Sequence, residues 1–246
     1  MIAAAQGTAV YVYGVLEPDV PVPPAVETVE HGGLVALVRE VSLDEFCEEA
    51  LPTNLNDREW LERHVRAHED VLAAAAEAAT VVPFRFGVIC HDRSDVARLL
   101  DEHADLLRRD LLRVRGCDEL GVKVWYDAPE DTASDEEPAD GRAYLERRRD
   151  DRRKALELAA ERETLVADAH ERLARYAVAS VVNRPQPKEL SGRDEPMLLN
   201  AAYLVRRGDE ALAREVASLH AAHATNGYAF ELTGPWPPYN FVGEDA

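Results

Sequence analysis

The sequence predicts an α+β fold of two domains. These are an N-terminal modified ferredoxin-like sheet with helices and, after a long charged helix, a smaller C-terminal ferredoxin-like α+β domain. Three observations predict this fold. The 246 residues suffice for two domains of ordinary size. Segments with the apolar period of a strand alternate along the chain with segments that have the period of a helix. A strongly acidic segment near the middle separates the two halves.

Residues 1–127 are expected to form the first domain, with helices packed on one face of its sheet. The strand segments are rich in β-branched and aromatic residues, and glycines or prolines stand at their ends. Asn56 or Asp57 can cap the longest helix of this half. The expected strands are 8–16, 34–41, 80–90 and 122–126, and the expected helices are 44–50, 57–79 and 94–115.

Residues 128–141 are expected to form an acidic linker between the domains. The stretch 127–140 holds seven acidic residues, two prolines and no basic residue. Such a segment has little apolar surface whose burial could offset the entropy of ordering it. We therefore expect an exposed connection rather than a packed element.

Residues 142–246 are expected to hold a long helix and the second domain, which ends in an aromatic tail. The first third of the helix carries the basic runs Arg147–Arg149 and Arg152–Lys154, and a solvated surface is favoured over pairing with an acidic loop or partner. The helix is expected to reach about Ala177, with apolar positions at Leu156, Ala159, Val166, His170, Leu173 and Ala177. A strand at 197–205, a helix at 209–224 and a strand at 227–233 complete this half.

The segment Val82–Gly87 is a candidate partner-binding strand. Strand alternation would place Phe84 and Phe86 on one face and Arg85 on the other. Pro83 lacks an amide donor, so the strand should lie at a sheet edge or contain a bulge. An edge strand can receive another chain by strand addition. The alternative, weighed equally, is that Arg85 forms an internal ion pair.

The tail, Thr233–Val242, follows the last strand and carries Trp236, Tyr239 and Phe241. Three prolines make this segment stiff and extended, so it loses little entropy when it docks. We expect it to pack across its own C-terminal domain and to shape a surface for a partner. Trp236 is expected to be buried enough that its replacement by alanine destabilises the fold, whereas Tyr239 is expected to be partly exposed.

Four segments resemble the gas vesicle protein L/F family. The tail is the most specific of them, and the segment ending at Gly87, which follows a helix with His64 and His68, is moderately specific. Together they extend the resemblance from about residue 8 to residue 242. The segments are Tyr11–Val15, Val82–Gly87, Asn200–Val205 and Gly234–Phe241.

This resemblance implies a non-enzymatic accessory protein of gas vesicle assembly that has two α+β domains and needs no cofactor. It also implies contacts with the hydrophobic shell protein and with other gas vesicle proteins, and a location at gas vesicles. The residues expected to contact a partner are Phe84, Arg85, Phe86, Trp236, Tyr239 and Phe241.

Composition excludes several other classes of partner. The formal charge of −19 repels the phosphates of nucleic acids and disfavours anionic membrane surfaces. No apolar run approaches the roughly 20 residues that cross a bilayer. Three cysteines without close spacing argue against a disulfide framework and suit a reducing cytoplasm. A soluble, acidic, cytoplasmic protein is therefore expected.

Catalytic and metal-binding patterns receive little support. His64 and His68 have the spacing of two metal ligands on a helix, but no third ligand is evident, and a core role is favoured for His68. Cys90, His91 and Asp92 are consecutive on a predicted strand, so their side chains cannot converge on one site. No phosphate-binding loop or nucleophile motif is present.

Two alternative functions stay open at this point. The first is a tandem ferredoxin-like enzyme or small-molecule-binding protein, which would need a polar pocket near His64, His68 or Arg85. The second is a minor structural component of the vesicle wall.

Overall fold

The computed structural model of the protein describes residues 7–24, 26–127 and 141–243, and these fall into two compact units. Unit 1 comprises residues 1–119 and 235–246, and unit 2 comprises residues 120–234. This division differs from the expected one at two places. The whole strand expected at 122–126 belongs to the second unit, and the aromatic tail from Pro235 belongs to the first. The expected acidic linker, apart from Gly141, lies outside the described residues.

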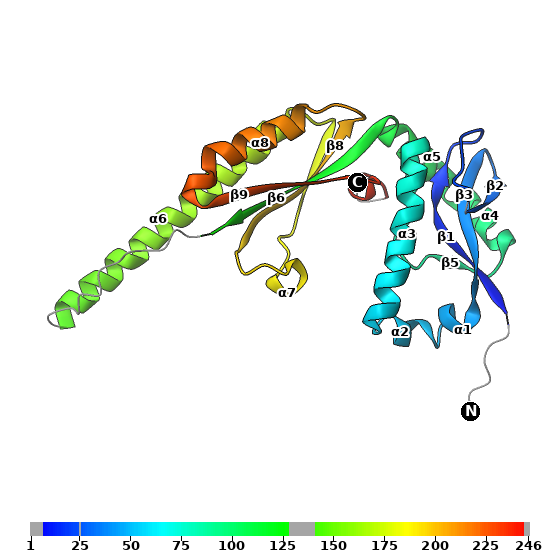
Figure 1. The fold of residues 1–246 in the computed structure, drawn as a ribbon, viewed down its shortest axis with the longest axis horizontal. Coiled ribbons are helices and arrows are strands. Elements are labelled where there is room, and N and C mark those ends of the chain that lie inside the picture. Colours follow the sequence, from blue (N-terminus) through cyan, green and yellow to red (C-terminus); the bar gives the residue numbers. More distant parts are fainter. Residues whose placement is uncertain (1–6, 25, 128–140, 244–246) are drawn as a thin grey trace. The chain divides into compact units, whose positions relative to one another are not determined.

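Unit 1 contains an antiparallel sheet with β1 at its centre (Figure 1). The strand order is β2-β3-β1-β4. β5 lies outside this order and pairs directly with β1. The bounds are β1 (Thr8–Leu16), β2 (Glu27–His31), β3 (Leu34–Ser42), β4 (Val81–Pro83) and β5 (Ile89–Cys90). The register of β1 against β3 shifts between Val12 and Gly14. A Cβ atom at Gly14 would lie 2.6 Å from the Val82 carbonyl oxygen, so only glycine permits this approach of β1 to β4.

Helices cover both faces of this sheet, whereas the sequence led us to expect them on one. The five helices in the described part of unit 1 are α1 (Leu43–Phe46), α2 (Leu51–Asn54), α3 (Arg58–Ala78), α4 (Arg93–Glu102) and α5 (Ala104–Val114). Tyr11 and Tyr13 of β1 pack in the cluster that contains the buried face of α3. Val10 and Val12 pack on the opposite face, with α4 and α5. A central strand that is apolar on both faces is buried on both, which explains the second helical layer.

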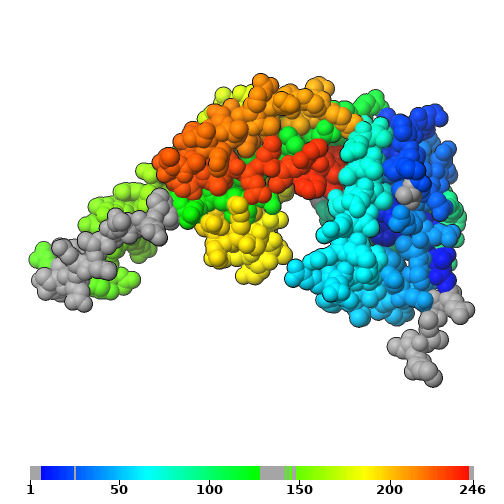
Figure 2. All heavy atoms as spheres, viewed as in Figure 1, coloured from blue at the N-terminus to red at the C-terminus, as the bar shows by residue number. Residues whose placement is uncertain are grey.

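Unit 2 has the βαββαβ order of a ferredoxin-like fold. The sheet order is β7-β8-β6-β9, and α6 and α8 pack together along one of its faces (Figure 1). The loop that carries α7 projects from this unit as a separate lobe in Figure 2. The bounds are β6 (Cys117–Tyr126), α6 (Gly141–Ala174), β7 (Ala179–Asn183), α7 (Lys188–Ser191), β8 (Met197–Arg206), α8 (Ala211–His223) and β9 (Tyr228–Trp236). Short 3₁₀ turns cover Ala224–Asn226 (η1) and Tyr239–Phe241 (η2).

Strand periodicity fixes the core of unit 2. Val122, Val124 and Tyr126 alternate along β6 and all face the helices. Alternate residues of β8 face the same layer, where the hydroxyl of Tyr203 lies 2.7 Å from His170 Nδ1 of α6. Strand β7 pairs antiparallel with β8 and was not expected from the sequence.

Helix α6 packs on unit 2 only through its C-terminal third. Leu156 was expected on the apolar face, but 64% of its surface is exposed. Burial begins near Leu165 and is complete at Ala169 and Leu173. The expected solvated start of the helix is thus longer than one third, because the sheet beneath it contacts only the later turns. None of the helices in the described ranges combines the length and apolar character required to cross a membrane.

Two leucines of α6 test this picture. Leu173 is fully buried, so Leu173→Ala should lower the free energy of unfolding by about 2–5 kcal/mol. Leu156→Ala on the same helix should change it by no more than about 0.5 kcal/mol. Chemical denaturation of both variants measures the difference. Equal losses for the two variants would mean that the N-terminal half of α6 is packed.

Candidate functional site

The tail, taken here as Pro235–Gly243, is part of unit 1. This corrects the expectation that it packs across the C-terminal domain. Gly234 has a φ of +108°, which glycine adopts readily, and Pro235 limits further strand pairing. Strand β9 ends at Trp236, and the chain leaves the sheet there. Within unit 1, Pro237, Pro238 and Phe241 are buried, and the chain forms the turn η2.

Three ionisable side chains are buried in unit 1, and each is hydrogen-bonded by the tail. Among the described residues, the buried polar side chains other than tyrosine are His68, Asp110 and Glu119, exposed by 1%, 1% and 5%. Burying such groups without partners is costly. The tail gives each of them one or more hydrogen bonds: Tyr239 contacts His68, Asn240 donates to Glu119, and Gly243 donates to Asp110.

His68 connects the tail to the centre of the sheet. Its Nε2 lies 3.2 Å from the Phe84 carbonyl, which can only accept, so we assign the proton to Nε2. Nδ1 then accepts from the Tyr11 hydroxyl at 3.0 Å. Nε2 also lies 3.2 Å from the Tyr239 hydroxyl, which donates to Glu69 Oε1 at 2.9 Å. Burial lowers the pKa of His68, so the neutral ring that this network requires is favoured.

Glu119 holds Asn240 with both carboxylate oxygens. The Asn240 backbone amide donates to Oε2 at 2.9 Å, and the side-chain amide donates to Oε1 at 2.6 Å. Burial raises the pKa of Glu119, and the two bonds from Asn240 oppose that shift. Hydrogen bonds to a charged group contribute about 1.5–3 kcal/mol each, so this pair fixes the path of the tail.

Asp110 fixes the end of the tail. Its Oδ2 accepts from the Gly243 amide at 2.8 Å. Its Oδ1 is buried without a hydrogen-bond partner, and Arg109 Nε lies 3.9 Å away. Arg113 donates to the Phe241 carbonyl at 3.3 Å. The last turns of α5 therefore bind the tail through both a carboxylate and a guanidinium.

The predicted strand at 80–90 is interrupted, which separates the two phenylalanines. β4 ends at Pro83, and a turn at Phe86–Gly87, where Gly87 has a φ of +92°, precedes β5. Phe84 packs on the face of the sheet that α4 and α5 cover, whereas Phe86 packs on the face that α3 covers. The centroid of the Phe86 ring lies 5.8 Å from that of the His68 ring. The prediction of one shared face for Phe84 and Phe86 is wrong, because the turn breaks the alternation. β4 does lie at the end of the strand order, as Pro83 indicated.

A groove of about 390 Å³ lies on unit 1 beside β4. β4 and the residues after it, α5 and the tail form its walls. Phe84, Arg85 and Tyr239 all line it, so the structure brings three of the six candidate residues together. Its other walls include Leu106, Leu107 and Val242. We call this surface the tail groove.

The other three candidate residues lie elsewhere. Phe86 is on the opposite face of the sheet and Phe241 is buried in unit 1. Trp236 does not line the groove and is 47% exposed, which corrects the expectation that it is a buried anchor. Tyr239 is half-buried, with its hydroxyl in the His68 network, so it supports the fold more than was expected.

The sequence reasoning missed Glu119, Asp110 and Asn240. Asp110 carried a signal, because it stands three residues after Leu107 and four before Val114 on the apolar stripe of its helix. A carboxylate on such a stripe predicts a buried partner. Glu119 and Asn240 are 121 positions apart, and no local pattern connects them.

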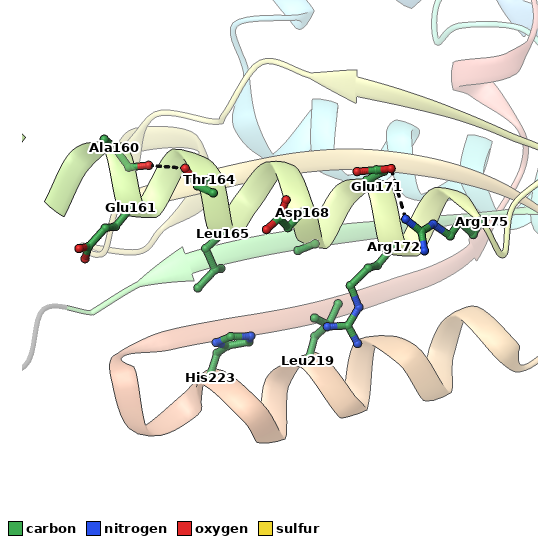
Figure 3. Close-up of a pocket in the computed structure, with 11 residues that line it drawn as sticks. Ala160, Glu161, Thr164, Leu165, Asp168, Glu171, Arg172, Arg175, Leu219 and His223 are labelled. Atoms are coloured by element: carbon green, nitrogen blue, oxygen red, sulfur yellow. Dashed lines mark hydrogen bonds and ion pairs between the residues drawn. The ribbon is translucent and has the colours of Figure 1, made fainter. Parts of the chain in front are cut away.

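Unit 2 has a larger depression of about 810 Å³ between α6 and α8 (Figure 3). Its charged residues include Glu161, Asp168, Arg172 and Arg175. Arg175 pairs with Glu171 at 3.2 Å, and Arg172 pairs with Glu215 of α8. Both arginines of the depression are thus already paired with carboxylates on the helix surfaces.

The histidines expected at an enzymatic pocket do not converge. His64 Nδ1 lies 2.8 Å from the Trp60 carbonyl, and its Nε2 lies 3.3 Å from Glu45. His68 is already hydrogen-bonded to Tyr11 and to Tyr239 of the tail. Asp92, the third residue of the Cys-His-Asp run, caps α4 by accepting from the amides of Ser94 and Asp95. Across the ranges that the structure describes, no three His, Cys, Asp or Glu side chains cluster as a metal site would require.

Comparison with known proteins identifies similar chains. Residues 9–243 match the family described as "Gas vesicle synthesis protein GvpL/GvpF". Gas vesicle protein L of Streptomyces sp. (strain CB03234) is 38% identical over 219 residues, which cover 87% of this chain and 81% of that protein. Gas vesicle protein L1 of Halobacterium salinarum (strain ATCC 700922 / JCM 11081 / NRC-1) is 27% identical over 241 residues, covering 88% and 80%.

Solved structures show the same fold. The crystal structure of gas vesicle protein GvpF from Anabaena sp. PCC7120 has a TM-score of 0.70 at 20% identity, over 96% of this chain and 97% of that one. The corresponding protein from Microcystis aeruginosa has a TM-score of 0.64 at 18% identity, over 96% and 99%.

Two aromatic residues of the tail, one buried and one exposed, should differ in how much they contribute to the stability of the fold. Phe241→Ala should lower the free energy of unfolding by about 3–5 kcal/mol, because the ring is buried among unit 1 residues. Trp236→Ala should cost no more than about 1 kcal/mol, because half of the ring surface stays in water. Thermal and denaturant melts of both variants measure this. A larger loss for Trp236→Ala than for Phe241→Ala would contradict the observed packing of the tail.

Proposed function

Because the chain belongs to the family of gas vesicle synthesis proteins GvpL/GvpF, we propose that it binds the hydrophobic shell protein during gas vesicle assembly. It acts as a non-enzymatic accessory protein in the cytoplasm, in association with gas vesicles. Its other partners are further gas vesicle proteins. Binding takes place before or during insertion of the shell subunit into the growing wall.

The tail groove is the observation that carries this proposal. A shell subunit that lines a gas-filled interior needs an apolar face, and that face would aggregate if it were left exposed in water. The groove offers Phe84, Leu106 and Val242 to such a face. Arg85 is exposed beside them and provides a guanidinium for a carboxylate of the partner.

The surrounding chain supports transient binding. The formal charge of −19 keeps a complex with an apolar partner in solution. β4 lies at the end of its sheet, so an extended segment of the shell protein can also be received beside it. Trp236, half exposed near the start of the tail, supplies a second apolar contact. Phe86 and Phe241 act indirectly, since they hold the sheet and the tail that form the groove.

The groove also distinguishes this function from its rivals. A small-molecule site would need a polar pocket near His64, His68 or Arg85, yet each of the histidines already has partners within unit 1. A structural component of the wall would remain on washed, intact vesicles, whereas a transient accessory protein would be removed. Retention on washed vesicles would favour the structural alternative.

Two leucines on α5 provide the test. Leu106 lines the groove and is half-buried, whereas Leu112 is exposed on the same helix and lies outside the groove. Leu106→Asp should reduce capture of the shell protein at least about tenfold, because a carboxylate would have to be desolvated against an apolar face. Leu112→Asp should capture it as the parent does.

The measurement is a pull-down with separately expressed shell protein, and circular dichroism verifies that both variants are folded. If the Leu106 variant is folded and still captures the shell protein as well as the Leu112 variant, the groove is not the binding surface.

A further inference from the structure

Unit 1 binds the tail through hydrogen bonds to particular residues of the tail. Glu119 takes two donors from Asn240, one from the backbone and one from the side-chain amide. Asp110 takes the backbone amide of Gly243, three residues later. The Tyr239 hydroxyl meets His68 and Glu69. These acceptors stand at fixed spacings, so unit 1 carries a receptor for a Pro-Pro-Tyr-Asn-Phe segment.

The tail is also a distinct piece of the chain. The boundary between the units falls at Gly234–Pro235, within the last residues of β9, which ends at Trp236. After Trp236 the remaining residues belong to unit 1. A short terminal segment that docks through its own residues is the kind of element that two copies of a protein can exchange.

We propose that the receptor on unit 1 can take the tail of a second copy of this chain, so that two molecules associate by exchanging tails. The bonds in the exchanged form are the same as in the single molecule, with Asn240 of one copy on Glu119 of the other. This self-association is separate from binding of the shell protein and does not require it.

The chemistry of the site selects this occupant over others. An amphipathic helix uses its own backbone amides internally, so beyond its first turn it has none to give to Glu119 and Asp110. A purely apolar segment would leave the carboxylates of Asp110 and Glu119 buried without the donors that the tail supplies. A second tail supplies every donor at the required spacing.

Concentration governs the balance between the two forms. A tail on a short tether has an effective concentration in the millimolar range for its own receptor. The unmodified protein is therefore monomeric when dilute, and exchange occurs where copies are crowded. Substitutions that weaken docking of the tail on its own molecule should allow two molecules to exchange tails at a much lower protein concentration.

Complementary full-length variants provide the experiment. The donor carries Glu119→Ala and Asp110→Ala, which weaken its receptor and leave its tail intact. The acceptor carries Tyr239→Phe and Asn240→Ala, which weaken its tail and leave its receptor intact. The two are labelled with different fluorophores and mixed, and sedimentation velocity measures heterodimers.

The expected result is a heterodimer in the mixture and monomers in each variant alone. Adding Asn240→Ala to the donor should weaken the heterodimer at least about tenfold, since it removes a bond to a carboxylate. If either variant fails to fold alone, refolding the two together gives the same readout, because a tail docked in trans restores the missing bonds.

Absence of a heterodimer from a mixture of folded variants, or of rescue on joint refolding, would overturn the proposal. So would a heterodimer that is unaffected by Asn240→Ala in the donor. No shell protein is present in this assay, so its failure would leave the proposed binding of the shell protein untouched.

Discussion

The burial of His68, Asp110 and Glu119 is the constraint on which unit 1 depends. An ionisable group removed from water requires hydrogen bonds in return, and the tail supplies them to all three. Loss of the tail would leave the two carboxylates without these donors, whereas His68 would keep Tyr11 and the Phe84 carbonyl, and the apolar area of Phe241 would also be lost. A segment at the far end of the chain is thus a structural part of the first unit.

The tail groove exists because of this constraint. Tyr239 and Val242 form one of its walls. The Tyr239 hydroxyl is bonded to Glu69, and the amide of Gly243, next to Val242, is bonded to Asp110. The same docking that satisfies buried charge therefore shapes the surface proposed for the shell protein. Any partner that displaced the tail would also dismantle the groove, so stability and binding are coupled here.

Local sequence patterns predicted the secondary structure more accurately than they predicted the tertiary contacts. The alternation in Val122–Tyr126 predicted a strand, but not that it belongs to the second sheet. Phe84 and Phe86 were assigned to one face because nothing in a strand pattern shows that β4 ends at Pro83 and that a turn begins at Phe86. Trp236 was expected inside because aromatic residues usually are. It instead ends strand β9 and is 47% exposed, and no local pattern in the tail distinguishes it from the buried Phe241.

A double-mutant cycle on Glu119 and Asn240 tests the dependence of unit 1 on its tail most directly. The free energy of unfolding is measured for the parent, Glu119→Ala, Asn240→Ala and the double variant. Asn240→Ala removes the side-chain bond to Glu119 and leaves the backbone amide in place, so the coupling energy should be about 1.5–3 kcal/mol, the contribution of one hydrogen bond to a charged group. A coupling energy near zero would show that the tail does not hold Glu119, and would contradict the account.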